Sequence, residues 1–211
     1  MKSTKERILK TALTLFNTLG LPKVTLRTIA KEMGISQGNL NYHFKKREDI
    51  ITALYYELVE QIDIHMKKNK CNEITLQTFF ESSNTVMSNF YRYRFFLLDF
   101  VQIIRNNREV KAHYQALTKK REKEFIILFK EMVKNDIIRP EELPNEYLFL
   151  YKRFHVMGDF WMSFAQITGQ KTTNKTISQF SEIAGQAIYP YLTKKGKYQF
   201  KLMFSNDKIV N

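Results

Sequence analysis

The stretch TLRTIAKEMGISQGNLNYHF, residues 25–44, decides the fold of the N-terminal part of this 211-residue chain. Thr25 stands where a helix N-cap is expected, before a short apolar face that begins at Ile29. Gly34 then interrupts the pattern, and Ser36 is placed to cap a second short helix. Two short helices joined by a glycine-containing turn form the helix-turn-helix layout.

The second helix of this pair is unusually rich in polar side chains. Residues 35–44, ISQGNLNYHF, contain two Asn, one Gln, one Ser, one Tyr and one His but no carboxylate. In the helix-turn-helix layout this helix enters the major groove of DNA. Asn and Gln can donate and accept hydrogen bonds together, which suits the adenine edge. A polar face that only meets solvent is the alternative interpretation.

The charge of the chain is concentrated near the same stretch. The formal net charge is +13, and residues 1–50 hold ten Lys or Arg against four Asp or Glu. The remaining 161 residues hold 24 and 17, so the N-terminal quarter is nearly three times as basic per residue. A local excess of positive charge favours a polyanionic partner, and it supports the DNA interpretation over the solvent one.

The DNA contacts can therefore be assigned to individual residues as expectations. For base and nearby backbone contacts we expect Gln37, Asn39, Asn41 and Tyr42, with Arg27 reaching in from the preceding helix. For the phosphates we expect hydroxyls, helix N-termini and positive charge from Thr25, Ser36, His43, Lys46 and Arg47. The predicted DNA-binding set also includes Gly38.

The same residues carry a family resemblance. Together with ILKTALTLFNTLG before it and KKREDI after it, the stretch resembles the N-terminal domain of the TetR family of transcriptional regulators, over residues 4–54. The matching positions are Phe16, Gly20, Thr25, Ile29, Ala30, Gly34, Ser36, Gly38, Leu40, His43 and Phe44. Asn41 stands where the family usually has Tyr, and Lys46 stands where a small capping residue often opens the fourth helix. These departures mean that no relative's operator sequence can be carried over.

The rest of the chain predicts an all-α protein with about nine helices. Ser3 followed by Glu6 is a capping-box pattern that opens the first helix. A longer helix begins at Glu48, and five more are expected over residues 75–91, 93–106, 109–136, 144–168 and 174–194. In the tail, Tyr198, Phe200, Leu202 and Phe204 alternate with polar or flexible residues, which suits either an extended arm or a packed strand.

The predicted domain boundaries follow from these elements, and the roles of the domains are those that the family resemblance implies. We expect a helix-turn-helix DNA-binding domain over 1–47, a linking helix over 48–70, a helical regulatory and dimerisation domain over 71–195, and a C-terminal tail over 196–211. The polar stretch MKKNKCNE, residues 66–73, is the clearest boundary. The family resemblance implies that the long helix links the DNA-binding domain to a ligand-binding domain.

Aromatic residues are crowded in the second half, with eighteen Phe, Tyr and Trp between residues 79 and 164. Most are expected in the core, but such a domain can also enclose an apolar cavity with a few orienting polar groups. The resemblance implies that this cavity binds a small inducer and that binding changes the separation of the two DNA-binding domains. Our candidate lining residues are Phe96, Phe100, Tyr114, Phe129, His155 and Trp161. A satisfied core or interface histidine is the alternative for His155.

The last two helices of the regulatory domain carry small residues that permit close helix packing. The resemblance implies that they pair with the same helices of a second subunit in a four-helix bundle. The candidate dimer contacts are Gly158, Phe180, Ala184, Gly185 and Ile188. Ordinary packing within one chain is the alternative interpretation.

Other classes of protein are not indicated. The single cysteine, Cys71, and four histidines show no metal-ligand spacing, so no metal or other cofactor is expected. No nucleophile elbow, P-loop or paired-glycine motif is present, so we expect no enzyme. There is no signal-peptide pattern or membrane-length apolar run, and a single cysteine suits a reducing compartment. We therefore expect a cytoplasmic protein without a membrane partner.

The predicted function is a ligand-responsive, homodimeric transcriptional regulator that binds a palindromic operator in double-stranded DNA. It is expected to be a repressor that an unknown small apolar effector releases. The alternative is a small-molecule-binding helical protein with only non-specific DNA binding. A third interpretation is a basic protein resting on anionic membrane through residues 194–201, but the sequence offers it no long cationic amphipathic helix.

Overall fold

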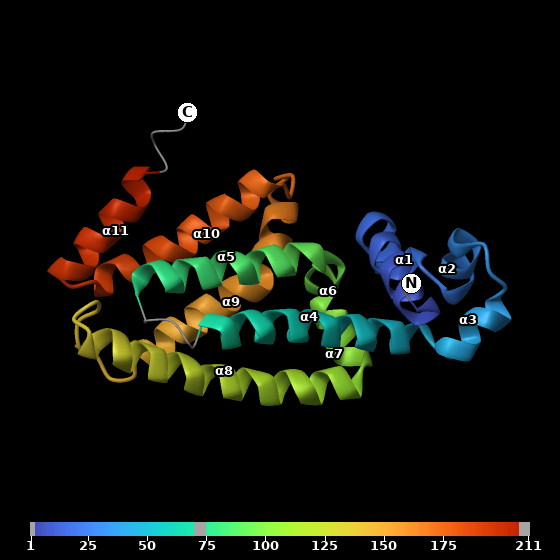
Figure 1. Ribbon diagram of the computed structural model, residues 1–211, viewed down its shortest axis with the longest axis horizontal. Helices are drawn as coiled ribbons and strands as arrows, with labels where there is room; N and C mark the ends of the chain where they lie inside the picture. The colour runs from blue at the N-terminus through green and yellow to red at the C-terminus, as the bar shows by residue number, and fades with distance from the viewer. Residues whose placement is uncertain (1–2, 70–74, 207–211) are drawn as a thin grey trace. The chain divides into compact units, whose positions relative to one another are not determined.

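The computed structural model of the chain describes residues 3–69 and 75–206. These residues contain eleven α-helices, two short 3-10 helices and no strand, apart from an isolated antiparallel bridge between Ile138 and Leu192 (Figure 1). The predicted all-α class is therefore confirmed. The helices are α1 Thr4–Leu19, η1 Leu21–Lys23, α2 Leu26–Met33, α3 Gln37–His43, α4 Arg47–Asn69, α5 Leu76–Arg92, α6 Arg94–Leu98, α7 Phe100–Asn106, α8 Arg108–Lys134, α9 Glu146–Ile167, α10 Asn174–Ile188, η2 Tyr189–Tyr191 and α11 Lys194–Asn206.

The chain forms two compact units. Unit 1 comprises residues 1–61 and 89–114, and unit 2 comprises residues 62–88 and 115–211. The helices α4, α5 and α8 each contribute residues to both units. The domain boundaries expected from the sequence stay predictions. Cys71 and part of the boundary stretch lie outside the described residues, as do residues 207–211.

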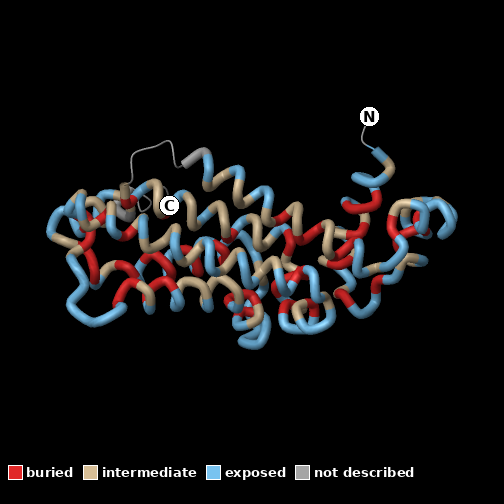
Figure 2. Tube along the Cα trace, turned by 90° about the horizontal axis from the view of Figure 1, so that it is seen from below, coloured by how far each residue is buried: buried red, intermediate tan, exposed pale blue. Residues whose placement is uncertain are grey.

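Unit 1 is built on a three-helix core of α1, α2 and α3. The capping box that Ser3 and Glu6 predict is present at the start of α1. Ile8, Ile29 and Leu40, one from each helix, are fully buried, and α2 packs on both α1 and α3. Along the helices buried and exposed residues alternate with the helical period, so each helix has one inward side (Figure 2).

A single amide side chain joins α1 to the start of α6. The Nδ2 of Asn17 donates to the carbonyl oxygen of Arg92 at 2.8 Å, and its Oδ1 accepts from the backbone N–H of Phe95 at 3.1 Å. Beside it the ring of Phe16 stacks on the ring of Phe95, with centroids 4.9 Å apart. The three N-terminal helices are therefore fixed to the segment 92–95 within unit 1.

Unit 2 has its own hydrophobic core, made by α5, α8, the α8–α9 connection, α9, the end of α10, and η2 with the residue after it. Its buried members are Leu76, Phe80, Phe129, Met132, Ile137, Ile138, Tyr147, Leu150, Ile188, Tyr191 and Leu192. At Gly185 of α10 the ring of Phe80 approaches so closely that an added Cβ would lie 2.0 Å from its Cε1 atom. Any larger residue at position 185 would therefore force the Phe80 ring to shift.

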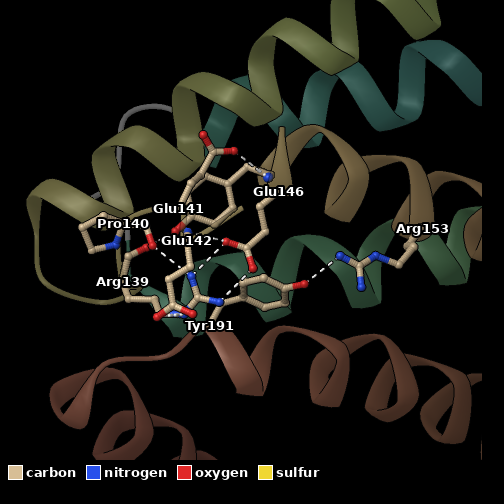
Figure 3. A network of polar contacts seen from close by, with 8 residues as sticks. Arg139, Pro140, Glu141, Glu142, Glu146, Arg153 and Tyr191 are labelled. Atoms are coloured by element: carbon tan, nitrogen blue, oxygen red, sulfur yellow. Dashed lines mark hydrogen bonds and ion pairs between the residues drawn. The ribbon is translucent and has the colours of Figure 1, made fainter. Parts of the chain in front are cut away.

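An arginine holds the connection between α8 and α9 (Figure 3). The Arg139 guanidinium donates to both carboxylate oxygens of Glu146, at 2.9 and 2.8 Å, and it lies over the ring of Tyr191. The Tyr191 hydroxyl in turn accepts from Arg153 of α9 at 2.6 Å. The bidentate ion pair and the backbone N–H of Glu142 lower the pKa of the buried Glu146 from 4.5 to about 2.

This lowered pKa predicts an acid-sensitive fold. The pKa of Glu146 is lower in the folded chain than in the unfolded chain. Its ionised carboxylate therefore contributes fully to the free energy of unfolding above pH 4.5, and this contribution is lost as the pH falls towards 2. Unfolding in that range should therefore take up a proton at Glu146, and Glu146→Gln should remove that proton from the pH dependence of the free energy of unfolding. Urea titrations from neutral pH to pH 3 would measure it. If the free energy of unfolding of the variant fell with pH as steeply as that of the wild type, the assignment would be contradicted.

The control for this prediction is Glu131→Gln, which removes only an exposed pair with Lys134 and should cost little stability.

Two expected helices differ from the structure. The helix expected over 93–106 is divided at Asp99, whose backbone at φ −104°, ψ 19° is not helical, into α6 and α7. No Gly or Pro marks this break in the sequence. The helix expected over 174–194 ends at Ile188, because Pro190 lacks the N–H that would continue the α-helical hydrogen bonds; the 3-10 helix η2, Tyr189–Tyr191, follows instead.

The tail is helical rather than extended. The alternation of residues 198–204 suggested an arm or a strand, whereas α11 runs from Lys194 to Asn206. Phe200 packs against the rings of Phe80 and Tyr189, with centroids 5.7 and 5.0 Å away. Contact with the core of unit 2 therefore overrides the local alternation. Across residues 3–69 and 75–206, no helix combines the length and apolar character needed to cross a membrane.

Candidate DNA-binding site

The turn before the second DNA-binding helix depends on a left-handed glycine. The Thr25 hydroxyl accepts from the backbone N–H of Thr28 at the start of α2, as its N-cap position predicts. At the other end of α2, Gly34 has φ 66° and its N–H donates to the carbonyls of Ala30 and Lys31. Glycine adopts this conformation without the steric cost of a side chain, so α2 can end and the chain can reverse into α3.

The helix α3 presents a polar side and an apolar side. Ser36 caps it by accepting from the backbone N–H of Asn39 at 3.2 Å. Leu40 and Phe44 are buried and seat the helix on the core. The four side chains of α3 that are expected to read bases are all exposed. We call them the reading face; they are Gln37, Asn39, Asn41 and Tyr42. Gly38 lies on α3 between the first two of these, and Arg27 is exposed on α2.

The residues expected to contact phosphates differ in how exposed they are and in the contacts that they already make. The side chains of Thr25, Ser36 and Lys46 are exposed. The two hydroxyls already accept a capping hydrogen bond, but each keeps a hydroxyl hydrogen to donate. Lys46 uses its backbone N–H to donate to Asp49, while its ammonium group reaches solvent. His43 is half-buried, with its ring edge-on to Tyr42 at 5.3 Å.

Arg47 has a structural role that its sequence position does not reveal. Its guanidinium donates to the carbonyl oxygens of Leu21 and Val24, at 3.2 and 3.4 Å, and it pairs with Glu48 at 3.3 Å. These contacts fasten the α1–α2 connection to the start of α4. We therefore assign Arg47 to positioning the helix-turn-helix, and its phosphate contact stays a prediction.

Two basic residues near the end of α3 were not singled out from the sequence. The Lys5 ammonium of α1 lies 5.7 Å from the ring centroid of Phe44. Lys45 follows Phe44 and is exposed. Because Lys5 is distant in sequence from α3, only the packing of α1 brings its charge there. Both lysines add positive charge at the C-terminal end of the reading face, where a DNA backbone would pass.

The residues expected to line an effector cavity divide between the two units. In unit 1, Phe96, Phe100 and Tyr114 form a continuous series of ring contacts with Tyr55, at centroid distances of 5.2, 5.7 and 5.0 Å. The hydroxyl of Tyr55 lies 2.8 Å from Nδ1 of His113. This series is a largely buried aromatic cluster with one polar pair.

In unit 2 the other three candidates occupy separate positions. Phe129 is fully buried in the core cluster. His155 stacks on Tyr151 with centroids 5.5 Å apart, and Trp161 packs against Phe180 at 5.0 Å. The assignment of these residues to a ligand stays a prediction.

Of the residues expected at a dimer interface, most are already covered within the chain. Phe180, Ala184, Gly185 and Ile188 are buried on the inner side of α10, and Gly158 is half-buried on α9. The outer side of α9 instead exposes several large apolar side chains. We call it the α9 stripe: Phe149, Val156, Phe160, Phe164 and Ile167, with exposed fractions from 40% to 84%. Their spacing of three, four or seven residues places them on one helix face.

Among residues 3–69 and 75–206, no three or more His, Cys, Asp or Glu side chains gather as a possible metal site.

Comparison with known families agrees with this geometry. The model of "Bacterial regulatory proteins, tetR family" matches residues 8–54, and the model of "Bacterial transcriptional repressor" matches residues 57–200. Together these matches cover nearly all of the described chain. The protein belongs to the TetR family of transcriptional regulators.

Individual relatives are more distant. The chain is 29% identical over 133 residues to YerO, an uncharacterized HTH-type transcriptional regulator of Bacillus subtilis (strain 168); the match covers 58% of this chain and 44% of YerO. The chain thus spans less than half the length of this curated relative.

Solved structures share the fold. A TetR-family transcriptional regulator from Marinobacter aquaeolei VT8 is similar with a TM-score of 0.87 at 23% identity, over 97% of this chain and 98% of that one. A putative transcriptional regulator from Saccharomonospora viridis, solved in complex with choline, is similar with a TM-score of 0.67 at 15% identity, over 90% and 98%.

The exposed amides of α3 give a direct test of base reading. We expect Asn41→Ala or Gln37→Ala to cost about 1–3 kcal/mol on the preferred site, or roughly 5-fold to 150-fold in affinity, and to relax the preference for the base pair that the amide contacts. Anisotropy titrations on the preferred duplex and its single-base-pair variants would measure both effects. Gln115→Ala, which removes an exposed amide on α8, is the control. Equal weakening on every sequence would show that the reading face lies elsewhere.

Proposed function

We propose that the protein is a homodimeric repressor that binds a palindromic operator and is released by a small apolar or amphipathic effector. The observation that carries the DNA-binding part is the reading face. Three amides and a tyrosine are exposed on a helix whose opposite side is anchored by Leu40 and Phe44. A polar helix side held rigidly by a buried apolar one suits insertion into the major groove.

Selection of bound sites from random duplex DNA tests this proposal. Two reading faces related by a two-fold axis should recover an inverted repeat whose half-sites are about one helical turn apart or a multiple of it. Enrichment without any shared sequence would instead favour a small-molecule-binding protein with only non-specific DNA affinity. Salt-dependent binding would accompany both results, so the recovered sequence is the observation that decides between them.

The dimer is proposed from the α9 stripe. Exposed apolar side chains of this size mark a candidate interaction surface, and pairing two such stripes around a two-fold axis would bury both. Ile183 on the outer side of α10 is also apolar and 45% exposed, so α10 can extend the contact. This supports a four-helix interface between α9 and α10 of each subunit, using their outer sides rather than the small residues of α10.

The effector is proposed from the aromatic residues of the regulatory helices. A structural relative holds choline, a small amphipathic cation, and here the aromatic series from Tyr55 to Tyr114 offers rings and a polar Tyr55–His113 pair. Any effector can release DNA only if it binds the DNA-incompetent arrangement more tightly than the competent one. By reciprocity, operator DNA must weaken effector binding by the same factor.

Calorimetry tests the effector step. A panel of apolar and amphipathic compounds, choline included, would be titrated into the protein alone and into its operator complex. A true effector should bind the free protein more tightly, by the factor by which it weakens DNA binding. Equal affinities in both titrations would exclude that compound, and failure of the whole panel would favour a repressor that small molecules do not control.

A further inference from the structure

The last helix, α11, has an outer side that neither DNA reading nor pairing through the α9 stripe uses. Its sequence, KKGKYQFKLMFSN, contains four lysines and no acidic residue. The sequence alone did not reveal a helix here, and the lysine-rich segment 194–201 therefore had no defined surface. Because α11 is helical, that segment has two distinct sides.

The inner side of α11 is fixed to unit 2. Gly196 lies so close to the connection after α8 that an added Cβ would be 2.1 Å from the carbonyl oxygen of Ile137. The ring of Phe200 packs on Phe80 and Tyr189, and Met203 also packs against the core. Positions 196, 200 and 203 follow the helical period, so the opposite side of α11 must face outward.

That outward side combines apolar and cationic groups. We call it the α11 face: Lys194, Tyr198, Lys201 and Leu202, all of which are exposed. Tyr198 is 65% exposed and Leu202 is 50% exposed, and at a spacing of four residues they lie on the same side of the helix. A large aromatic ring and a leucine thus stand in solvent between lysines.

Two further lysines stand at the edges of this surface. Lys195 donates from its Nζ to the carbonyl oxygen of Asn135 at 2.9 Å, and Lys197 lies over the ring of Tyr189. Neither of these two contacts is with a carboxylate. The α11 face is therefore an apolar pair bordered by positive charge on both sides.

We propose that the α11 face docks the protein reversibly on an anionic lipid bilayer. Lysines flanking Tyr198 and Leu202 match a surface with negative headgroups above an apolar interior, because the ammonium groups stay at the headgroups while the ring and the leucine enter the boundary. Duplex DNA offers phosphates to the lysines but no apolar interior to the other two. Each lysine near such a surface contributes about a fivefold gain in affinity. This is surface association and requires no membrane-crossing helix.

The experiment is co-sedimentation of the full chain with sucrose-loaded vesicles, in excess duplex DNA so that the reading face is occupied. Vesicles of phosphatidylcholine alone would be compared with vesicles that also contain phosphatidylglycerol. We expect binding to the anionic vesicles only. Lys194→Gln/Lys201→Gln should weaken it about tenfold or more, and Tyr198→Ser/Leu202→Ser should weaken it several-fold although no charge changes.

A matched control separates the α11 face from general positive charge. Lys119→Gln/Lys130→Gln removes two exposed lysines of α8 and gives the same net charge as the α11 lysine variant. It should bind within twofold of the wild type. Circular dichroism would verify that each variant is folded, since all of the substituted side chains are exposed.

Three results would overturn the proposal. The wild type could fail to bind anionic vesicles, or the α8 control could weaken binding as much as the α11 lysine variant. The third is an unchanged affinity of Tyr198→Ser/Leu202→Ser for vesicles, which would leave only non-specific charge attraction. Heparin retention provides a further discrimination. If Tyr198→Ser/Leu202→Ser weakens binding to heparin as strongly as it weakens binding to vesicles, the partner is a soluble polyanion and not a bilayer.

Discussion

Val156→Glu should convert the protein to monomers at micromolar concentration and reduce its affinity for the operator by about 100-fold to 1,000-fold, or roughly 3–4 kcal/mol. Val156 is 59% exposed in the middle of the α9 stripe, so a glutamate there is harmless to the isolated chain. In a dimer the carboxylate would be buried without a partner, at a cost of several kcal/mol. Operator binding would fall with dimerisation, because each monomer contacts only one half-site.

The control for this prediction is Ile127→Glu. Ile127 is 62% exposed on α8 and lies outside the α9 stripe. The substitution therefore replaces an exposed apolar side chain with a carboxylate, as Val156→Glu does. Analytical ultracentrifugation should show a dimer for this variant and for the wild type, and a monomer for Val156→Glu. A monomeric wild type, or a Val156→Glu dimer with normal operator affinity, would remove the α9 stripe as the interface.

Gly185→Glu should lower the free energy of unfolding by about 3–5 kcal/mol, a large fraction of the total for a protein domain. Its Cβ would collide with the Phe80 ring, which is packed against Phe200 and cannot withdraw easily. The carboxylate would also be placed in an apolar core. Gly185→Ala should cost less, about 1–2 kcal/mol, since overpacking is partly offset by the better helix propensity of alanine.

A double-mutant cycle measures the cause of this effect. In a Phe80→Leu background the ring is absent, so Gly185→Ala should become nearly neutral in urea unfolding. Gly38→Ala is the matched glycine control, because its Cβ would meet only the Ser36 hydroxyl at 3.9 Å, and it should not destabilise the protein. An equal cost for Gly185→Ala in both backgrounds would exclude the contact with Phe80 as the reason for glycine.

The parts of the fold that the sequence predicts are those determined over a few neighbouring residues. Ser3 with Glu6, Thr25 with Thr28, and Ser36 with Asn39 each form their cap within three positions, and caps of this range are visible in any sequence window. The left-handed turn at Gly34 is equally local. For this reason the three N-terminal helices agree with the prediction.

What the sequence did not show depends on distant contacts. Arg47 looks like any basic residue beside a DNA-binding helix, and only the folded chain brings it to the carbonyls of Leu21 and Val24. The tail alternates over residues 198–204, yet packing of Phe200 and Met203 on unit 2 selects a helix. Gly185 is expected from the sequence at a close contact with a second subunit, and that contact stays a prediction; within the chain its neighbour is Phe80, which lies more than 100 residues earlier.

The hydrogen bonds of Asn17 have a consequence for the construction of chimaeric regulators. The amide of Asn17 is satisfied by backbone groups of Arg92 and Phe95, which lie far beyond the family match that ends at residue 54. A DNA-binding segment transplanted from this protein by a cut at that boundary would leave those partners behind. The recipient would then have to present a carbonyl and an N–H at equivalent places. The transferable module is therefore unit 1, whose residues 89–114 must accompany residues 1–61.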